Sequence, residues 1–243
     1  MNEQTLEKMK RMKLHGMHRC FNSVLQVSGM NQLTADQLVA QLIESEWDDR
    51  HNRAVERSVR NARFRYKASV ELIDYSLNRG LDQNLIQRLA ECNFIKASEN
   101  IIITGSTGTG KSFLASAIGN QACLLGYKVY YANALRLLNQ LKMAKADGSA
   151  LQELMRIEKQ DLLILDDFGI QPLDGPSRLL LMELIEDRHS KRSTIFAGQV
   201  PVDAWYDIIG DNTLADAILD RIVHKAHQVE LKGESLRKKR KEN

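Results

Sequence analysis

The sequence has few of the residues that typify secreted and membrane proteins. Its 243 residues include three cysteines, and no two of them form a Cys-x-x-Cys pair. That spacing argues against a disulfide framework or a cysteine zinc site and is typical of buried thiols in a reducing compartment. No apolar run approaches the ~18 residues of a transmembrane helix, and the N-terminal residues lack a continuous apolar core. We therefore expect a cytoplasmic protein without a membrane anchor.

Proline is rare as well, with three residues, and the chain has no internal repeat. Hydrophobic residues make up 43% and charged residues 27%, which argues against a disordered or fibrous chain. The length leaves room for one large domain and a small additional one.

The net charge is only +3, but the basic residues are unevenly distributed. Seven basic residues and one acidic residue, Glu56, lie between Arg50 and Lys67, and a second basic cluster, LRKKRK, spans Leu236 to Lys241. Both clusters are candidates for contacts with nucleic acid.

The apolar pattern divides the chain into two parts. Over residues 1–67 apolar residues recur at three- and four-residue steps, which predicts a small all-helical domain. Thr34 and Gln37 form a capping box, so a helix should begin near Ala35 and continue into the basic run. Residues 68–243 instead alternate short apolar runs with helical patterns. The predicted strands are 101–104, 128–131, 161–166, 194–197 and 227–231.

Strand and helix alternation predicts an α/β fold with a parallel sheet covered on both faces and ligands at the carboxyl ends of the strands. The intervening helices should begin at Lys111, near Asn133, near Pro176 and near Thr213, where Asp216 could complete a threonine cap.

The segment GSTGTGKS, residues 105–112, follows a predicted strand and opens a predicted helix. This order is that of a phosphate-binding loop, in which backbone N–H groups and a helix N-terminus hold a polyphosphate. Lys111 is placed for the β- and γ-phosphates, and the Ser112 hydroxyl for Mg²⁺. The predicted nucleotide-binding residues are Gly105, Ser106, Thr107, Gly108, Thr109, Gly110, Lys111, Ser112 and Phe113.

A second motif, DLLILDDF at residues 161–168, is an apolar strand that ends in two carboxylates. We expect Asp166 to contact Mg²⁺ and Asp167 to act as the base that polarises an attacking water. Many ATPases with this loop carry Asp-Glu here, and the shorter Asp167 reaches less far.

Gln199 follows the predicted strand 194–197. If this strand neighbours the phosphate-loop strand, Gln199 could orient the attacking water. The alternative is a polar residue that opens the turn before Pro201.

The basic run predicts a nucleic-acid contact. Arg50, Arg53, Arg57 and Arg60 are spaced 3, 4 and 3 residues apart on one helix face, and Arg63 follows. Guanidinium rows match successive phosphates, whereas no base-reading signature is present, so binding should be largely sequence-independent. The alternative is a solvated helix face. Phe64 and Tyr66 are expected to pack rather than to stack on bases.

Four segments together resemble the IstB family of transposition helper ATPases. They are residues 105–131, LLILDDFG at 162–169, DRIVHKAHQVELKGES at 220–235, and EWDDRHNRAVERSVRNARF at 46–64. The resemblance covers essentially the whole chain, and the last three segments discriminate it from other ATPases. IstB is encoded beside an IstA-type transposase in bacterial insertion sequences and is related to the DnaC and DnaI helicase loaders of the AAA+ superfamily.

The resemblance implies an AAA+ three-layer core with sheet order 5-1-4-3-2, a minimal C-terminal lid, and ATP and Mg²⁺ bound between subunits of a homo-oligomer. It implies that Arg221 is an arginine finger that acts on the neighbouring subunit's γ-phosphate. It further implies assembly on duplex DNA, DNA bending, and stimulation of an IstA-type transposase. Many relatives carry Asn, Ser or Thr where this chain has Gln199.

Two other functions fit parts of the sequence. A DnaC/DnaI-type helicase loader would share the ATPase domain, although such loaders often carry a dedicated helicase-binding N-terminus. A small-molecule phosphotransferase would need an acceptor pocket and a lid, and neither is visible in the sequence. Arg237 could contact the nucleotide from a short final helix, or belong to a flexible tail that binds nucleic acid.

Overall fold

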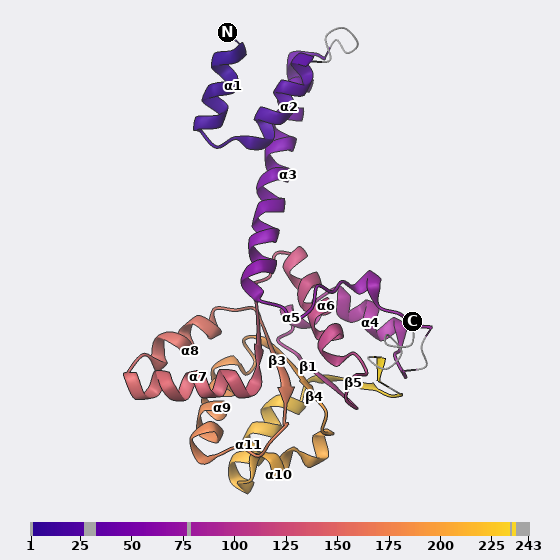
Figure 1. The fold of residues 1–243 in the computed structure, drawn as a ribbon, viewed down its shortest axis with the longest axis vertical. Helices are drawn as coiled ribbons and strands as arrows, with labels where there is room; N and C mark the ends of the chain where they lie inside the picture. Colours follow the sequence, from indigo (N-terminus) through magenta and orange to yellow (C-terminus); the bar gives the residue numbers. More distant parts are fainter. Residues whose placement is uncertain (1, 27–32, 77–78, 234, 237–243) are drawn as a thin grey trace. The chain divides into compact units, whose positions relative to one another are not determined.

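The computed structural model describes residues 2–26, 33–76, 79–233 and 235–236 (Figure 1). The chain forms two compact units, Met1–Arg57 and Ser58–Asn243. This division falls earlier in the chain than the boundary expected after Lys67, because residues from Val59 to Tyr66 pack into the core of the second unit. Ala62, for example, is completely buried there.

The first unit is helical. α1 (Asn2–Arg11) and α2 (His15–Gln26) precede α3 (Ala35–Ala62), whose last turns belong to the second unit. The capping box predicted for α3 is confirmed: the Thr34 N–H donates to Gln37 Oε1 at 3.0 Å, and the Gln37 N–H donates to Thr34 Oγ1 at 3.3 Å.

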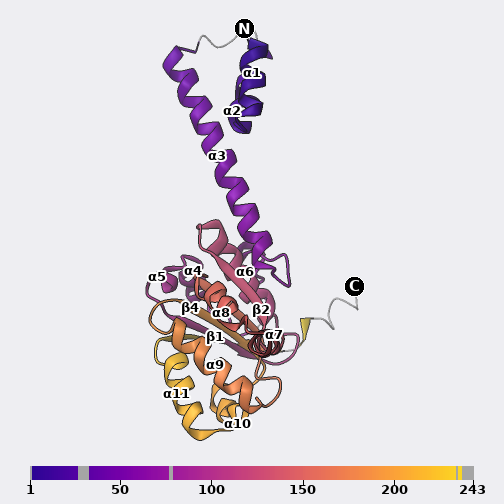
Figure 2. The same cartoon turned by 90° about the vertical axis from the view of Figure 1, so that its left-hand side faces the viewer.

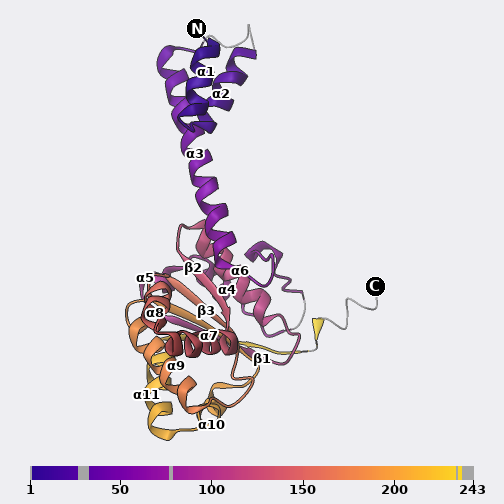
Figure 3. The same cartoon turned by 60° about the vertical axis from the view of Figure 1, so that its left-hand side comes forward.

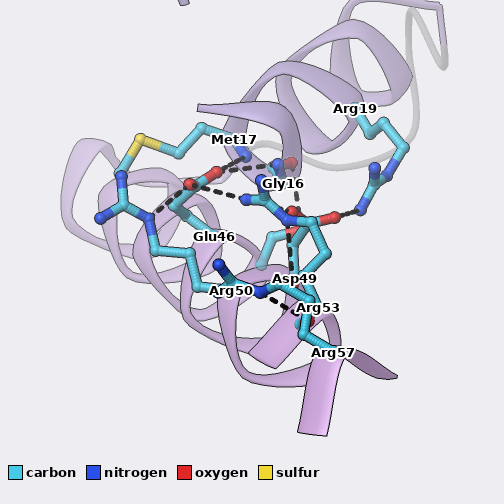
Figure 4. A network of polar contacts seen from close by, with 9 residues as sticks. Gly16, Met17, Arg19, Glu46, Asp49, Arg50, Arg53 and Arg57 are labelled. Atoms are coloured by element: carbon cyan, nitrogen blue, oxygen red, sulfur yellow. Dashed lines mark hydrogen bonds and ion pairs between the residues drawn. The ribbon is translucent and has the colours of Figure 1, made fainter. Parts of the chain in front are cut away.

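A carboxylate joins α2 to α3 in this unit. Glu46 Oε2 accepts hydrogen bonds from the N–H groups of Gly16 at 2.8 Å and Met17 at 3.3 Å (Figure 4). Arg50 Nε donates to the other oxygen, Oε1, at 2.7 Å. Burial alone would raise the pKa of Glu46, but these hydrogen bonds outweigh it and hold the pKa below its usual range. Glu46 therefore serves as an anionic anchor at the amino end of α2.

The crossing of α2 and α3 depends on close approach at Gly16. A Cβ on this residue would overlap the carbonyl oxygen of Ser45 and lie 2.6 Å from the Cα of Glu46. Within the described part of this unit only Gly16 and Glu46 are buried, and no apolar side chain is. The unit therefore has no apolar core to compensate for a disturbed crossing.

We expect Gly16→Ala to destabilise the helical unit by about 1 to 3 kcal/mol, because the added methyl group meets backbone atoms that cannot rotate away. Limited proteolysis and urea unfolding of the full-length protein would measure this effect. Gly175→Ala is the matched control, since a Cβ there meets nothing within 4 Å. Equal proteolytic resistance of the two variants would show that the crossing tolerates a side chain.

The second unit is built on a five-stranded parallel sheet of order β2-β3-β4-β1-β5. Read from the other edge this is 5-1-4-3-2, so the predicted α/β fold and strand order are confirmed. The bounds are β1 (Asn100–Gly105), β2 (Val129–Asn133), β3 (Leu162–Phe168), β4 (Ser193–Gly198) and β5 (Ala226–Leu231).

Helices cover both faces of the sheet, giving three layers. One core contains residues of α4, α5, α6 and alternate strand positions, and the other contains residues of α7 to α11 and the remaining positions. Figures 2 and 3 show α7, α8 and α9 together on one side of the sheet. The bounds are η1 (Val70–Leu72), α4 (Gln83–Ala90), α5 (Asn93–Lys96), α6 (Lys111–Leu124), α7 (Ala134–Asp147), α8 (Ala150–Glu158), α9 (Gly175–Arg188), η2 (Val202–Ala204), α10 (Trp205–Ile209) and α11 (Asn212–Val223).

One helix start differs from the prediction. α11 is capped by Asp211, whose side chain accepts from the Leu214 N–H at 2.9 Å, and not by Thr213. Asp211 was the better cap because Gly210, with φ 69°, turns the chain immediately before it. The short helices α8 and α10 were not predicted.

Cys92 and Cys123 are fully buried, as expected, whereas Cys20 is only partly buried. Burial raises the pKa of Cys92 to about 12 and also raises that of Cys123, so both thiols stay protonated. Over the described residues, no helix combines the length and apolar character needed to cross a membrane.

Candidate functional site

The phosphate-binding loop connects β1 to α6 and requires glycine at two positions. Gly105 has φ 143°, and a Cβ there would overlap the carbonyl oxygen of Leu231. Gly108 has φ 85°, and its Cβ would overlap the Ser235 hydroxyl. Side-chain residues rarely adopt such conformations, so glycine lets the loop pack tightly against the chain that follows β5.

Lys111 lies inside this loop at the first position of α6. Its side chain is largely buried, and Nζ donates to the carbonyl oxygens of Gly105 at 2.7 Å and Ser106 at 2.8 Å. Gly110, Lys111, Ser112 and Phe113 line a pocket of about 390 Å³ beside the loop. The loop residues predicted to bind the nucleotide therefore lie beside a common pocket, and their contact with phosphates stays a prediction.

Asp166 is the buried member of the carboxylate pair that ends β3. It is 2% exposed, and its Oδ1 accepts from Ser112 Oγ at 2.9 Å. The Tyr131 hydroxyl donates to the other oxygen, Oδ2. Burial, together with the neighbouring Asp166 carboxylate, raises the pKa of Tyr131, so the phenol remains a donor.

Asp167 is oriented by an irregularity in the strand. It adopts a left-handed conformation with φ 57°, and the pairing of β3 with β4 shifts register between Asp166 and Phe168. Bulges of this kind redirect side chains, and such strained backbone clusters at functional sites. Asp167 thereby lines the pocket, where its Oδ2 accepts from Asn133 Nδ2 at 3.0 Å.

The oxygens of Ser112 and Asp166 fit a magnesium ion. Adjacent ligands of an octahedral Mg²⁺ lie about 2.9 Å apart, since each is 2.0–2.1 Å from the metal, and Ser112 Oγ and Asp166 Oδ1 are 2.9 Å apart. The described residues hold no cluster of three or more His, Cys, Asp or Glu side chains suited to a metal. Two protein oxygens leave coordination positions of the kind that substrate phosphates and water usually fill at Mg²⁺ sites.

Gln199 reaches the same pocket because β4 lies beside β1 in the sheet. Its Oε1 accepts a hydrogen bond from Thr107 Oγ1, in the phosphate-binding loop, at 2.7 Å. The strand adjacency on which the prediction depended is present, and the role of Gln199 toward water stays a prediction.

Sequence reasoning missed several residues of the pocket. Arg65 and Tyr66 line it from the segment after α3, and Leu236 lines it from the segment after β5. Arg65 Nη1 donates to Asp166 Oδ2 at 3.3 Å and to Asp167 Oδ2 at 3.0 Å. No local pattern marks these residues, because the contacts join parts of the chain that lie far apart in sequence.

The segment after β5 packs directly on the phosphate-binding loop. The Leu236 N–H donates to the Gly108 carbonyl at 3.0 Å, and Ser235 lies against the Cα of Gly108. The GES motif at 233–235 could have signalled this contact, since it belongs to the discriminating segment of the sequence. Arg237, predicted to contact the nucleotide, lies outside the described residues.

Arg221 and the phosphate-binding loop lie at opposite ends of the strands, Arg221 near the amino ends and the loop at the carboxyl end of β1. On α11 its Nη1 donates to the Ala217 carbonyl at 2.8 Å, and its Nε forms an ion pair with Glu186 Oε2 at 2.5 Å. It lines a cavity of about 200 Å³ beside Asn100 and Thr194, near the amino ends of β1 and β4. The cationic and imidazole side chains of this cavity are Arg188, His189, Arg192, Arg221, His224 and Lys225.

The predicted DNA-binding row is less uniform than its spacing suggests. Arg50 pairs with Glu46, and Arg53 pairs with Asp49 at 2.6 Å (Figure 4). The expected shortage of compensating acids was wrong, because acids one turn earlier on α3 supply the partners. Arg57 and Arg60 are exposed and form no ion pair with any described residue.

Arg63 departs from the row. α3 ends at Ala62, and Arg63 adopts a left-handed conformation with φ 59° just beyond it. Phe64 packs edge-to-face on Tyr131, and Tyr66 packs on Phe113, which confirms the expected packing of both rings.

Solved structures of known proteins share the fold of the second unit. The crystal structure of the DnaC helicase loader superposes with a TM-score of 0.58 and 21% identity, covering 69% of this chain and 98% of the loader. A superposition of this quality shows a common fold, in agreement with the fold expected from the sequence.

Sequence comparisons identify closer relatives. The insertion sequence ATP-binding protein y4pL of Sinorhizobium fredii is 42% identical over 234 residues, which cover 96% of each chain. The ATP-binding protein of insertion sequence IS21 from Pseudomonas aeruginosa is 30% identical and is aligned over 96% of this chain and 88% of its own. The model of the IstB-like ATP binding protein family matches residues 7–243. Because this match spans both the helical unit and the nucleotide pocket, the chain belongs to the IstB-like ATP-binding protein family.

Proposed function

We propose that the protein is an ATPase that assembles on duplex DNA as an ATP-dependent homo-oligomer, bends the duplex, and recruits and stimulates the transposase of an insertion sequence. The single observation that carries the proposal is the arrangement around Asp166. Ser112, Asp167 and Gln199 meet there beside the phosphate-binding loop. A site that hydrolyses a nucleotide needs residues of these types in this arrangement. The chain also belongs to a family of insertion-sequence ATP-binding proteins, which supports a nucleotide as the ligand.

Five residues of the site have roles in the proposed hydrolysis. Lys111 would bind the β- and γ-phosphates, while Ser112 and Asp166 would hold Mg²⁺. Bound Mg²⁺ supplies positive charge to the phosphate oxygens. Asp167, turned into the pocket by its bulge, would accept a proton from the attacking water, and Gln199 would orient that water.

The position of Arg221 supports a site shared between subunits. Arg221 borders the amino ends of the strands, whereas the phosphate-binding loop follows the carboxyl end of β1. An arginine at the amino ends of the strands would contact the nucleotide of a neighbouring subunit and not the nucleotide of its own subunit. In a head-to-tail assembly it would stabilise the charge that develops on the γ-phosphate.

The exposed guanidinium groups of α3 support a contact with duplex DNA. Arg57 and Arg60 lie on one helix face, without ion-pair partners among the described residues. Phosphate contacts carry no base information, so the proposed binding is largely sequence-independent, and contacts from several subunits would offset the cost of bending. On the same helix Val39, Ile43 and Trp47 form an exposed apolar stripe, Trp47 being 72% exposed, which supports a protein partner.

A doubly labelled duplex tests the nucleotide switch. With ATP or a non-hydrolysable analogue, we expect DNA affinity at least about tenfold higher than with ADP, the usual range of such coupling. Energy transfer between fluorophores at the two ends should rise with ATP, because bending brings the ends together. Equal affinity and equal transfer in the two nucleotide states would defeat the switch.

Two variants show which groups make the contact. Arg57→Gln combined with Arg60→Gln should weaken DNA binding and lower its salt dependence, because two phosphate contacts are lost. Arg88→Gln removes an exposed charge from α4 and is the matched control. Pull-down with the transposase and with a replicative helicase separates the proposed function from a helicase loader.

A further inference from the structure

Arg65 contacts both carboxylates of the candidate hydrolytic site, although it lies outside the ATPase motifs. One guanidinium nitrogen, Nη1, donates to Oδ2 of Asp166 at 3.3 Å and to Oδ2 of Asp167 at 3.0 Å. The two carboxylates differ in surroundings, since the Asp166 side chain is 3% exposed and that of Asp167 is 27% exposed. A single cationic group thus links the buried acid to the more exposed one.

The chain around Arg65 is anchored so that its side chain faces the pocket. α3 ends at Ala62, and the left-handed conformation of Arg63 turns the chain. Phe64 then packs edge-to-face against Tyr131, with ring centroids 6.2 Å apart. Tyr66 packs against Phe113, with centroids 6.5 Å apart. These two ring contacts anchor the residues on either side of Arg65, whose own side chain contacts the two acids.

The oxygens that Arg65 contacts are not the one suited to the metal. Oδ2 of Asp166 accepts from Tyr131 and Arg65, and Oδ2 of Asp167 accepts from Asn133 and Arg65. Oδ1 of Asp166 faces Ser112 instead. Donors on the Oδ2 side therefore hold both carboxylates in one orientation and leave the Ser112 side to the metal.

An ordinary surface ion pair would not explain this arrangement. The Arg65 side chain is 43% exposed, and ion pairs at that exposure contribute little to folding stability. The Arg65 hydrogen bonds matter instead for the position of the catalytic base, because a displacement of about 1 Å can lower a reaction rate by about 100-fold. The bulge turns Asp167 into the pocket, and Arg65 and Asn133 hold its carboxylate there through hydrogen bonds to Oδ2.

Resting on the proposed ATP hydrolysis, we propose that Arg65 is a positioning residue of the hydrolytic site, which holds Asp166 and Asp167 in their working orientation from the segment that follows α3. Among the described residues, its side-chain hydrogen bonds go to the two acids and not to the loop. Its effect passes through the two acids, so it should influence turnover more than nucleotide binding.

Steady-state kinetics with Arg65→Ala test this role. We expect kcat to fall about 10- to 100-fold, because Asp167 loses its fixed direction, while KM for ATP changes little. Arg65→Lys should show an intermediate kcat, since one ammonium group can reach one carboxylate at a time. Free guanidinium ion at millimolar concentration should restore part of the activity of Arg65→Ala. Arg88→Ala, which removes an exposed arginine from α4, should change none of these quantities.

A binding measurement separates positioning from competition with the metal. Mn²⁺ bound together with a non-hydrolysable ATP analogue, followed by electron paramagnetic resonance, should bind Arg65→Ala as tightly as the wild-type protein. Tighter Mn²⁺ binding with higher turnover would overturn the proposal, because Arg65 would then compete with the cation. Loss of nucleotide binding, or wild-type kcat in Arg65→Ala, would overturn it as well. Absence of ATP hydrolysis by the wild-type protein, with and without DNA, would instead defeat the ATPase proposal itself.

Discussion

Lys111→Ala is expected to abolish ATP binding at physiological nucleotide concentrations. The Lys111 ammonium lies inside the phosphate-binding loop, within 2.8 Å of two loop carbonyl oxygens. Bound phosphates would exchange these neutral partners for charged ones, and charge-assisted hydrogen bonds are the stronger kind. We expect Kd for ATP to rise at least about 100-fold, equivalent to about 2.7 kcal/mol.

Anisotropy of a fluorescent ATP analogue measures this change directly. Lys96→Ala removes an exposed lysine at the end of α5 and should bind ATP like the wild-type protein. Thermal unfolding without nucleotide checks that Lys111→Ala is folded, since two loop carbonyls lose their donor. A folded Lys111→Ala protein with unchanged ATP affinity would show that the loop does not hold the triphosphate.

Arg221→Ala is expected to bind ATP but to hydrolyse it at least about 1000-fold more slowly, the lower range for loss of an arginine finger. Binding should persist because Arg221 lies at the amino ends of the strands, remote from its own loop. Folding should persist as well, since the partner that it leaves, Glu186, is 54% exposed and can be hydrated. Single-turnover hydrolysis and equilibrium binding separate the two effects.

Mixing two inactive variants tests whether the site is shared. A Lys111→Ala subunit retains Arg221, and an Arg221→Ala subunit retains the nucleotide loop. In an equal mixture, about a quarter of head-to-tail interfaces would combine the two intact halves. We therefore expect ATPase activity to reappear on mixing. Lys191→Ala is the control variant, because it changes an exposed residue outside the Arg221 cavity and should be active without mixing. No recovery in a mixture that co-assembles would argue against a finger acting between subunits.

The strands and most helix starts could be predicted because their signals are local. The capping box of Thr34 and Gln37 involves residues three positions apart, and the glycines and Lys111 of the loop lie within one short segment. Strand order came from the family resemblance rather than from any local pattern. Local reasoning also misplaced the α11 cap, where Asp211 and Thr213 competed two positions apart.

The arginine row shows the limit of counting charges along a sequence. Arg50 and Arg53 appeared free because the charges were counted from Arg50 onward. Their partners, Glu46 and Asp49, lie outside that range, each one helical turn before the arginine with which it pairs. The same acids hold α2 against α3, with Arg19 pairing to Asp49 across the crossing. Two arginines of the row therefore serve the helical unit, and Arg57 and Arg60 are left as the better candidates for phosphate contacts.

By itself the sequence determined the chemistry of this protein: a loop that holds phosphates, a strand that ends in two acids, and an alternation that requires a parallel sheet. Each of those features is encoded by residues close together in the sequence, so it can be recognised without knowing how distant segments pack. Only the tertiary structure decided how the acids are aimed, through the bulge at Asp167 and the guanidinium of Arg65. The tertiary structure alone also showed that Ser235 lies against the phosphate-binding loop and that Arg221 lies near the amino ends of the strands. Side-chain contacts between segments about 100 residues apart arise from packing of the whole core, so no local pattern records them.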